Sequence, residues 1–223
     1  MYLRMPQQLV TLFPGEHPDK FVVHKEFACH YSPVLERAFN GDFIEGQKQE
    51  YRFQDIGGEA VRLLVHWFYT QDLDTIMLDR LCTSKQQEEG NAYPVSQRNQ
   101  DRALAQLWVL ADKLLIPRLQ NAVIDEIVRI KQHTNFATTK EIKYVFDNTA
   151  PSSCLRRLYV DSCIKNCIPN TKHIGDSARF PKELLIEMVV RFTELLEDTK
   201  RRSIDPCQNV TLYHVPETLR PES

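Results

Sequence analysis

The residue types best suited to metal binding gather towards the end of this 223-residue chain. Cys163, Cys167, His173 and Cys207 follow one another there, and four such side chains could hold Zn²⁺. Structural zinc sites favour cysteines separated by two or four residues on turns, whereas three residues separate Cys163 from Cys167. Cysteines four positions apart also lie on one face of a helix, and free cysteine is commonly buried. We therefore predict no bound metal and keep a zinc-binding regulator as a distant alternative.

The sequence carries no motif for catalysis. It has no G-x-S-x-G and no H-E-x-x-H pattern, and its 7 glycines are few for a loop that cradles phosphate. Cys29 and His30 are adjacent, and neighbours on a helix do not face each other. We predict no catalytic residues, no cofactor and no enzymatic activity.

The charge balance and hydropathy exclude further classes. Lys and Arg number 28 against 30 Asp and Glu, which argues against a dedicated nucleic-acid binder. No apolar run approaches the ~18–20 residues that span a bilayer, and the N-terminus lacks the long apolar stretch of a signal peptide. We therefore expect reduced cysteines in a cytoplasmic or nuclear protein. The basic run at residues 200–202 is interpreted as complementing the last helix dipole, with a nuclear import signal as the alternative.

The N-terminal region is predicted to form a hairpin followed by helices. Residues 9–13 and 21–23 are β-prone, and a Pro- and Gly-containing segment separates them. A helix is expected over residues 25–31. Ser32 and Pro33 suit the N-cap and first position of the next helix, and Gly41 is expected to end it in a left-handed cap.

The middle of the chain alternates between apolar periodicity and a polar break. A third strand is expected at residues 51–53, and Val61, Leu64, Val65 and Phe68 repeat at helical spacing. Residues 83–101 are polar and are expected to form a mobile insertion. Two amphipathic helices should follow. Their apolar residues are Leu104, Leu107, Trp108, Ala111, Leu114 and Leu115 in the first, and Leu119, Val123, Ile127 and Ile130 after Pro117 in the second.

Helices continue towards the C-terminus. Thr138 and Glu141 fit a capping box ahead of an apolar face formed by residues 142, 145 and 146. Ser152 or Ser153 should cap the next helix. A last helix is expected after Pro181. Its apolar face would contain Leu185, Met188, Val189, Phe192, Leu195 and Leu196.

These elements predict an α+β fold dominated by helix, in which helices flank a small sheet and an all-helical extension follows. We divide the chain into a domain over residues 1–132, containing the insertion at 83–101, a helical extension over 133–200, and a loose tail over 201–223.

Residues 21–35 read FVVHKEFACHYSPVL. A strand that ends in His-Lys, a helix, and a second helix opened by Ser-Pro resemble the signature of the BTB/POZ family. Further pieces follow in the family's order at residues 38–45, 64–70 and 110–114. The resemblance extends over residues 9–130, and the rest is similar to the helical C-terminal extension of many fungal BTB proteins.

The resemblance implies a protein–protein interaction module that forms a homodimer or assembles protein partners. It implies structural roles for the residues that match the family motif. These are His24, Lys25, Ser32, Pro33 and Asp112.

The run Phe43-Ile44-Glu45 resembles a pattern by which BTB adaptors contact the cullin scaffold of an E3 ubiquitin ligase. The Phe43 side chain would enter an apolar pocket of the partner, and the Glu45 carboxylate would add a charged contact. Phe39 is a third candidate contact residue. Alternatively, Phe43 is a core residue and Glu45 a solvated charge. A substrate adaptor is therefore the alternative to a plain interaction module.

Overall fold

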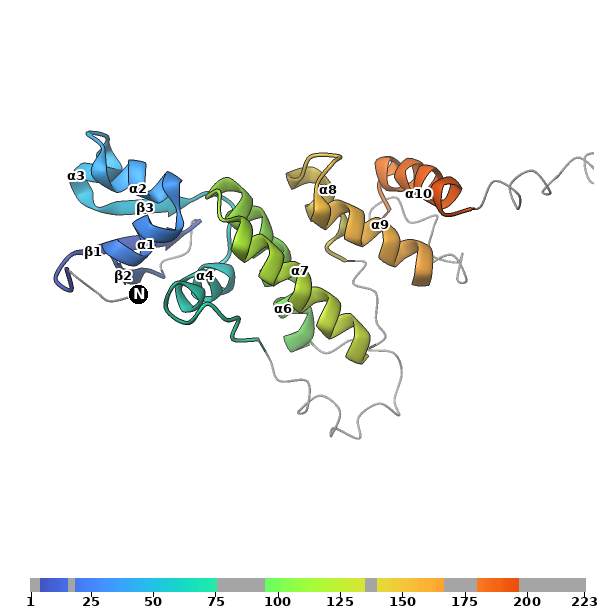
Figure 1. The fold of residues 1–223 in the computed structure, drawn as a ribbon, viewed down its shortest axis with the longest axis horizontal. Helices are drawn as coiled ribbons and strands as arrows, with labels where there is room; N and C mark the ends of the chain where they lie inside the picture. The colour runs from blue at the N-terminus through green and yellow to red at the C-terminus, as the bar shows by residue number, and fades with distance from the viewer. Residues whose placement is uncertain (1–4, 16–18, 76–94, 135–139, 167–179, 197–223) are drawn as a thin grey trace, which may run out of the picture.

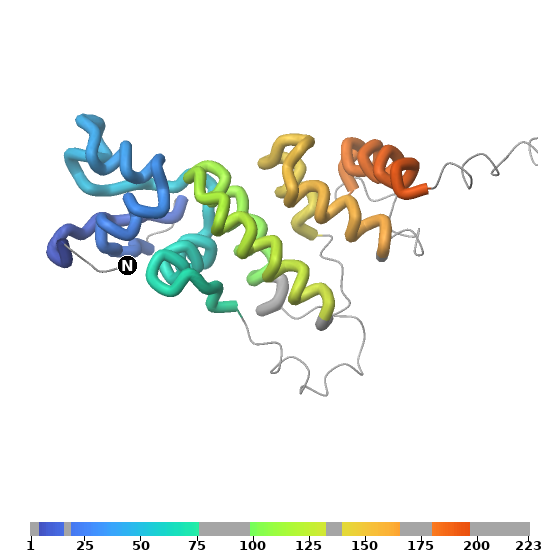
Figure 2. The backbone as a smooth tube through the Cα atoms, viewed as in Figure 1, coloured from blue at the N-terminus to red at the C-terminus, as the bar shows by residue number. Residues whose placement is uncertain are grey.

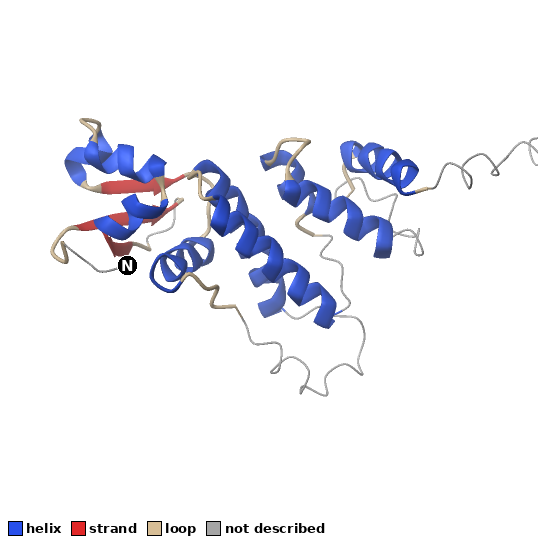
Figure 3. Ribbon diagram, in the orientation of Figure 1, coloured by secondary structure: helices blue, strands red, loops and turns tan. Residues whose placement is uncertain are grey.

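The computed structural model describes residues 5–15, 19–75, 95–134, 140–166 and 180–196 (Figure 1). Three short strands form a sheet at one end, and helices make up most of the remaining structure (Figure 3). The strands are β1 (Leu9–Pro14), β2 (Phe21–His24) and β3 (Glu50–Phe53). The helices are α1 (Lys25–Tyr31), α2 (Pro33–Asn40), α3 (Ile44–Lys48), α4 (Gly58–Thr70), α6 (Val95–Lys113), α7 (Pro117–Thr134), α8 (Ile142–Asn148), α9 (Cys154–Asn166) and α10 (Lys182–Leu195). The predicted helix-dominated fold with a small sheet is confirmed.

The predicted hairpin and third strand are both present. β1 pairs with β2 in antiparallel fashion and with β3 in parallel, so that β1 is central. Side chains alternate along a strand, and Val10 and Leu12 of β1 are buried while Leu9 is exposed. Val22 lies on the same outer face as Leu9 and is also exposed. One sheet face therefore belongs to the core, and the other carries exposed apolar side chains.

Ser32 caps α2 as predicted, because the backbone N–H of Leu35 donates to its Oγ at 3.1 Å. The predicted left-handed cap at Gly41 is wrong, since Gly41 has φ −89° and ψ 173° and is extended. Glycine is needed there for space, because a Cβ would lie 2.8 Å from the carbonyl oxygen of Arg37. The sequence analysis also missed α3, whose five residues are too few to show periodicity.

The core continues through α4, α6 and α7. The predicted buried positions of α7, from Leu119 to Ile130, are confirmed. Leu115, predicted on the buried face of α6, is instead 57% exposed with φ 57°, because it follows the helix end in a left-handed turn. The predicted insertion is wrong at its C-terminal end, where residues 95–101 belong to α6 and Gln100 and Asp101 are buried. Residues 83–94 lie outside the described residues.

The chain then passes to α8, α9 and α10, and it runs in sequence order from the sheet to α10 (Figure 2). Ser153 is the cap of α9, because its Oγ accepts the N–H of Arg156 at 3.1 Å. The predicted capping box is wrong, because Glu141 itself occupies the N-cap position of α8 and its side chain makes no capping bond. Glu141 is buried instead, and burial raises the pKa of its carboxyl group. Thr138 lies outside the described residues.

The helix after Pro181 is confirmed as α10, and its predicted buried face is confirmed at Met188 and Leu185 but wrong at Val189, Phe192 and Leu195. Leu184 and Met188 are buried, whereas Val189, Phe192 and Leu195 are exposed. Two ion pairs to α9 accompany this orientation. Glu187 accepts from Arg156 at 2.7 Å, and Arg191 donates to Asp161 at 2.8 Å. Charged residues of α10 therefore lie towards α9, and several apolar residues point outward. None of the helices in the described parts of the chain is long and apolar enough to cross a membrane.

Candidate partner-binding surface

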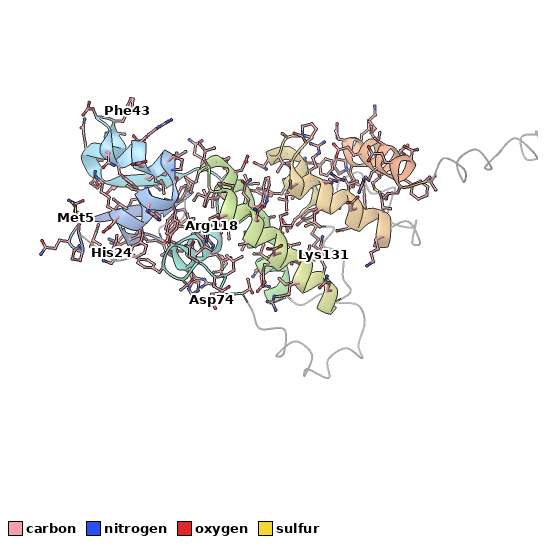
Figure 4. All side chains as sticks on the ribbon, viewed as in Figure 1. Met5, His24, Phe43, Asp74, Arg118 and Lys131 are labelled. Carbon is pink, nitrogen blue, oxygen red and sulfur yellow. The ribbon has the colours of Figure 1, made fainter. Side chains whose placement is uncertain are left out.

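The connection from α2 to α3 places two neighbouring apolar side chains on the surface. Phe43 is 76% exposed and Ile44 is 58% exposed, and Figure 4 shows Phe43 at the outer edge of the molecule. Phe43 is the N-cap residue of α3, and its carbonyl oxygen accepts the N–H of Gln47 at 3.0 Å. The short helix therefore fixes the backbone of both residues. The alternative in which Phe43 is a core residue is wrong.

Two glycines allow α3 to lie close to the end of α2. A Cβ on Gly46 would lie only 2.0 Å from the carbonyl oxygen of Gly41 and 3.1 Å from that of Ala38. No side chain larger than hydrogen fits this contact without moving the backbone. Gly46 therefore sets how far α3, and with it Phe43, stands from α2.

Lys25 and Gln49 both bind the end of α2, from which this connection begins. The Lys25 Nζ donates to the carbonyl oxygen of Phe39 at 2.9 Å, and the Gln49 Nε2 donates to the same oxygen at 3.0 Å. This oxygen belongs to the last turn of α2, where carbonyl groups lack partners within the helix. Lys25, implied by the resemblance to be structural, thus positions the loop that carries Phe43.

Glu45 lies beside a shallow groove between this loop and α6. The groove has a volume of about 450 Å³. It is lined by Glu45, Tyr51, Arg52, Phe53, Gln54, Ile56, Leu110, Lys113 and Leu114. Glu45 is half-buried, not a fully solvated charge. Burial, and secondarily the negative charge of Glu45, raise the pKa of the Tyr51 hydroxyl. The surface thus combines an exposed apolar pair, a carboxylate and, across the groove, the ammonium group of Lys113.

The prediction that Phe39 contacts a partner is wrong. Its side chain is 1% exposed and packs edge-on against Tyr51, with ring centroids 6.3 Å apart. It faces inward because it lies on the same side of α2 as buried Leu35, four positions earlier. The second exposed apolar side chain of the surface is instead Ile44, at the position of the sequence pattern where any residue is allowed. The sequence feature that could have identified Ile44 is the pair of adjacent large apolar residues, Phe43 and Ile44, shortly after the end of a helix.

The remaining motif residues connect elements of the fold. His24 ends β2, and its Nδ1 lies 2.8 Å from the Tyr69 hydroxyl of α4. Buried Ser32 donates to the carbonyl oxygen of Leu114 at 2.8 Å, which joins α2 to the end of α6. Pro33 is the first residue of α2. Asp112 is exposed and accepts from the Gln120 Nε2 at 3.1 Å, which spans the turn from α6 to α7.

The predicted zinc alternative remains untested, because only Cys163 of its four residues lies in the described parts of the chain. Cys163 is 2% exposed on α9, as expected for a cysteine on a buried helix face. Within the described residues, no three Cys, His, Asp or Glu side chains come together as a metal site would require. Burial raises the pKa of the Cys29 thiol, and the His30 ring packs on Tyr31.

Comparison with known proteins identifies the domain that carries this surface. A search of curated proteins finds no match. Among solved structures, the BTB domain of zebrafish PATZ1 is similar, with 18% identity and a TM-score of 0.34, over 54% of this chain and 75% of that chain. The family model of the BTB/POZ domain matches residues 10–85, which include the sheet, α1 to α4 and the Phe43 surface. This region of the chain therefore matches a BTB/POZ domain, and BTB/POZ domains are generally protein–protein interaction modules.

Proposed function

We propose that this chain is a non-enzymatic interaction module that binds a protein partner through Phe43, Ile44 and Glu45. The exposed Phe43 side chain carries the proposal, because 76% of it contacts solvent although the fold offers a large apolar core. Hot spots of protein interfaces are large apolar or aromatic side chains that become buried in a pocket of the partner. Glu45 beside it would fix the orientation through a charged contact.

The partner class that this surface fits is the cullin scaffold of an E3 ubiquitin ligase. The pattern of an apolar residue, any residue and Glu resembles the contact of BTB adaptors, and Phe43 and Ile44 are exposed at an edge of the molecule with half-buried Glu45 beside them. The helices after the BTB/POZ domain would then be available to read a substrate. In this proposal the chain acts as a substrate adaptor.

Binding of the full chain to the N-terminal domain of a BTB-class cullin tests this function. The double variant Phe43→Ala, Glu45→Lys should weaken binding at least tenfold, because it removes the anchor and reverses the charge. Val190→Ala, which changes a 53% exposed residue on distant α10, is the matched control and should bind like the wild type. No measurable binding by the folded wild type would overturn the adaptor role.

A second candidate function is self-association as a homodimer. The outer face of the sheet favours it, since Leu9 and Val22 are 48% and 53% exposed on adjacent paired strands. Light scattering should then give about twice the chain mass of 26.1 kDa, and Leu9→Asp with Val22→Asp should return the mass to one chain. A concentration-independent monomer would contradict the homodimer.

A further inference from the structure

Strand β3 is an edge strand, and the side that faces away from β1 is open. The strand order β2-β1-β3 gives β3 a single neighbour. The backbone N–H of Gly15 donates to the carbonyl oxygen of Phe53 at 2.6 Å, so the backbone of Phe53 faces β1. Backbone groups of successive strand residues point to alternate sides, so those of Glu50 and Arg52 point away from β1. Within the described parts of the chain, these outward groups have no hydrogen-bond partner.

The groove of about 450 Å³ runs along this open side. A groove on one face of a strand would meet every second residue, because side chains alternate between the two faces. This groove is instead lined by four consecutive residues, 51–54. It therefore follows the edge of β3. Its apolar part consists of Ile56 and of Leu110 and Leu114 from α6.

The volume of the groove matches one extended segment. A strand residue advances about 3.3 Å, lies about 4.8 Å from its neighbour strand and occupies a layer about 10 Å thick, which is about 160 Å³. Three such residues take up about 480 Å³, close to the groove volume of about 450 Å³. A helix uses its own backbone groups internally and would leave those of Glu50 and Arg52 without partners. The groove therefore fits a strand better than a helix.

The charges beside the edge specify the residues of such a strand. Glu50 and Arg52 are both exposed, and neither forms an ion pair with another described residue. The Arg52 Nη1 donates to the carbonyl oxygen of Gly15 at 3.0 Å, and its other N–H groups remain available. In antiparallel addition, an acidic residue opposite Arg52 and a basic residue opposite Glu50 would form favourable cross-strand pairs. An apolar residue between them would lie opposite Tyr51 and face into the groove.

We propose that the edge of β3 binds an extended segment of another protein as a fourth, antiparallel strand. In this segment an acidic, an apolar and a basic residue follow one another. Strand addition of this kind takes its affinity from main-chain hydrogen bonds and its specificity from alternate side chains. In a second copy, β3 lies in the same groove between α3 and α6, whereas a single extended segment has no flanking helices. The contact needs neither Phe43 nor a cullin, so it goes beyond the proposed function.

Titration of the isotope-labelled full chain with the blocked peptide Thr-Glu-Val-Lys-Thr, followed by NMR, tests this contact. We expect saturable shifts of the Glu50 and Arg52 amides and at least fivefold slower hydrogen exchange at both. The Tyr51 and Phe53 amides face β1 and should change less. N-methylation at the glutamate and lysine of the peptide should weaken binding at least tenfold, because these amides face β3. N-methylation at its valine, whose amide faces away, is the matched control and should bind like the parent peptide.

Two variants separate the backbone contact from the charge. Arg52→Thr and Arg52→Pro both remove the guanidinium group, but only proline removes the N–H, and an edge strand tolerates proline. Arg52→Pro should bind the peptide at least tenfold more weakly than Arg52→Thr. Absence of saturable shifts in the wild type, or equal binding of the two N-methylated peptides, would overturn strand addition. Shifts of the Glu50 and Arg52 amides with chain concentration, in the absence of peptide, would overturn it in favour of a second copy.

Discussion

Two helix contacts in this protein, α4 with α6 and α9 with α10, are built from different chemistry. Helices α4 and α6 pack together; Leu63, Leu64 and Phe68 of α4 are at most 1% exposed, and Leu104 and Leu107 of α6 are buried in the same core. Between α9 and α10, two arginine–carboxylate pairs cross a contact in which Leu184 and Met188 of α10 are also buried. Hydrophobic burial holds the first contact, whereas the second contact combines buried apolar side chains with ion pairs. Apolar periodicity therefore identifies the buried face in the first case and only part of it in the second.

The largest expected effect comes from truncating a side chain in the first contact. Leu64→Ala should lower the free energy of unfolding by about 2–5 kcal/mol, because the side chain is fully buried. Met188 of α10 is 7% exposed, so for Met188→Ala the loss of unfolding free energy should lie at the lower end of that range. Urea unfolding followed by fluorescence checks both, since Trp67 and Trp108 lie in α4 and α6. Leu64→Ala should shift the fluorescence transition, whereas Met188→Ala should shift only the helical circular dichroism. Equal fluorescence shifts would show that both contacts unfold as one unit.

A smaller effect is expected at Lys131, which joins the two regions. Its Nζ donates to the Ser162 Oγ of α9 at 2.7 Å and lies 4.9 Å from the ring centroid of Tyr159 (Figure 4). Burial lowers the pKa of this ammonium group to about 8. The negative charges of Cys163 and Asp101 act in the other direction and raise the pKa, but burial has the larger effect. Between pH 8 and 10.5 the unfolded chain therefore binds more protons than the folded chain, and stability rises with pH by up to about 3 kcal/mol.

Urea unfolding of wild type and Lys131→Met at pH 7.5 and 9.5 measures this contribution. The wild type should gain stability over that interval relative to the variant, because only the wild type carries the buried amine. Other titrating groups are common to both chains and cancel in the difference. The same pH dependence in both chains would contradict a buried Lys131.

The sequence predicted the N-terminal fold well, because its local signals agree with its tertiary packing. β-Prone runs identified β1 and β2, Ser32-Pro33 marked the start of α2, and helical spacing located the buried residues of α4 and α7. In the C-terminal region the element starts at Ser153 and Pro181 were also predictable from local chemistry. The orientation of α10 was predictable only in part, because α10 also contacts Arg156 and Asp161 of another helix, which periodicity within α10 cannot reveal.

The candidate surface was predictable in part. The spacing of Phe43 and Glu45 identified the segment, but whether Phe43 points to solvent depends on the close approach of Gly46 to Gly41. Phe39 was misplaced because it falls on the buried side of α2. The converging bonds from Lys25 and Gln49 to the Phe39 carbonyl join residues far apart in sequence, and no local pattern signals them.

The smallest effects are expected at the two serine caps. Ser32 caps α2 in the N-terminal region and Ser153 caps α9 in the C-terminal region, so the two regions can be compared through single hydrogen bonds. Ser153→Ala removes one capping bond at the partly exposed start of α9 and should cost about 1 kcal/mol. Ser32→Ala removes the same bond and also leaves the buried carbonyl of Leu114 without its donor, so it should cost about 2–3 kcal/mol. Urea unfolding monitored by circular dichroism measures both. Ser32→Thr retains the hydroxyl and should recover part of the loss. Equal costs for the two alanine variants would mean that the bond from Ser32 to Leu114 adds nothing to the cap.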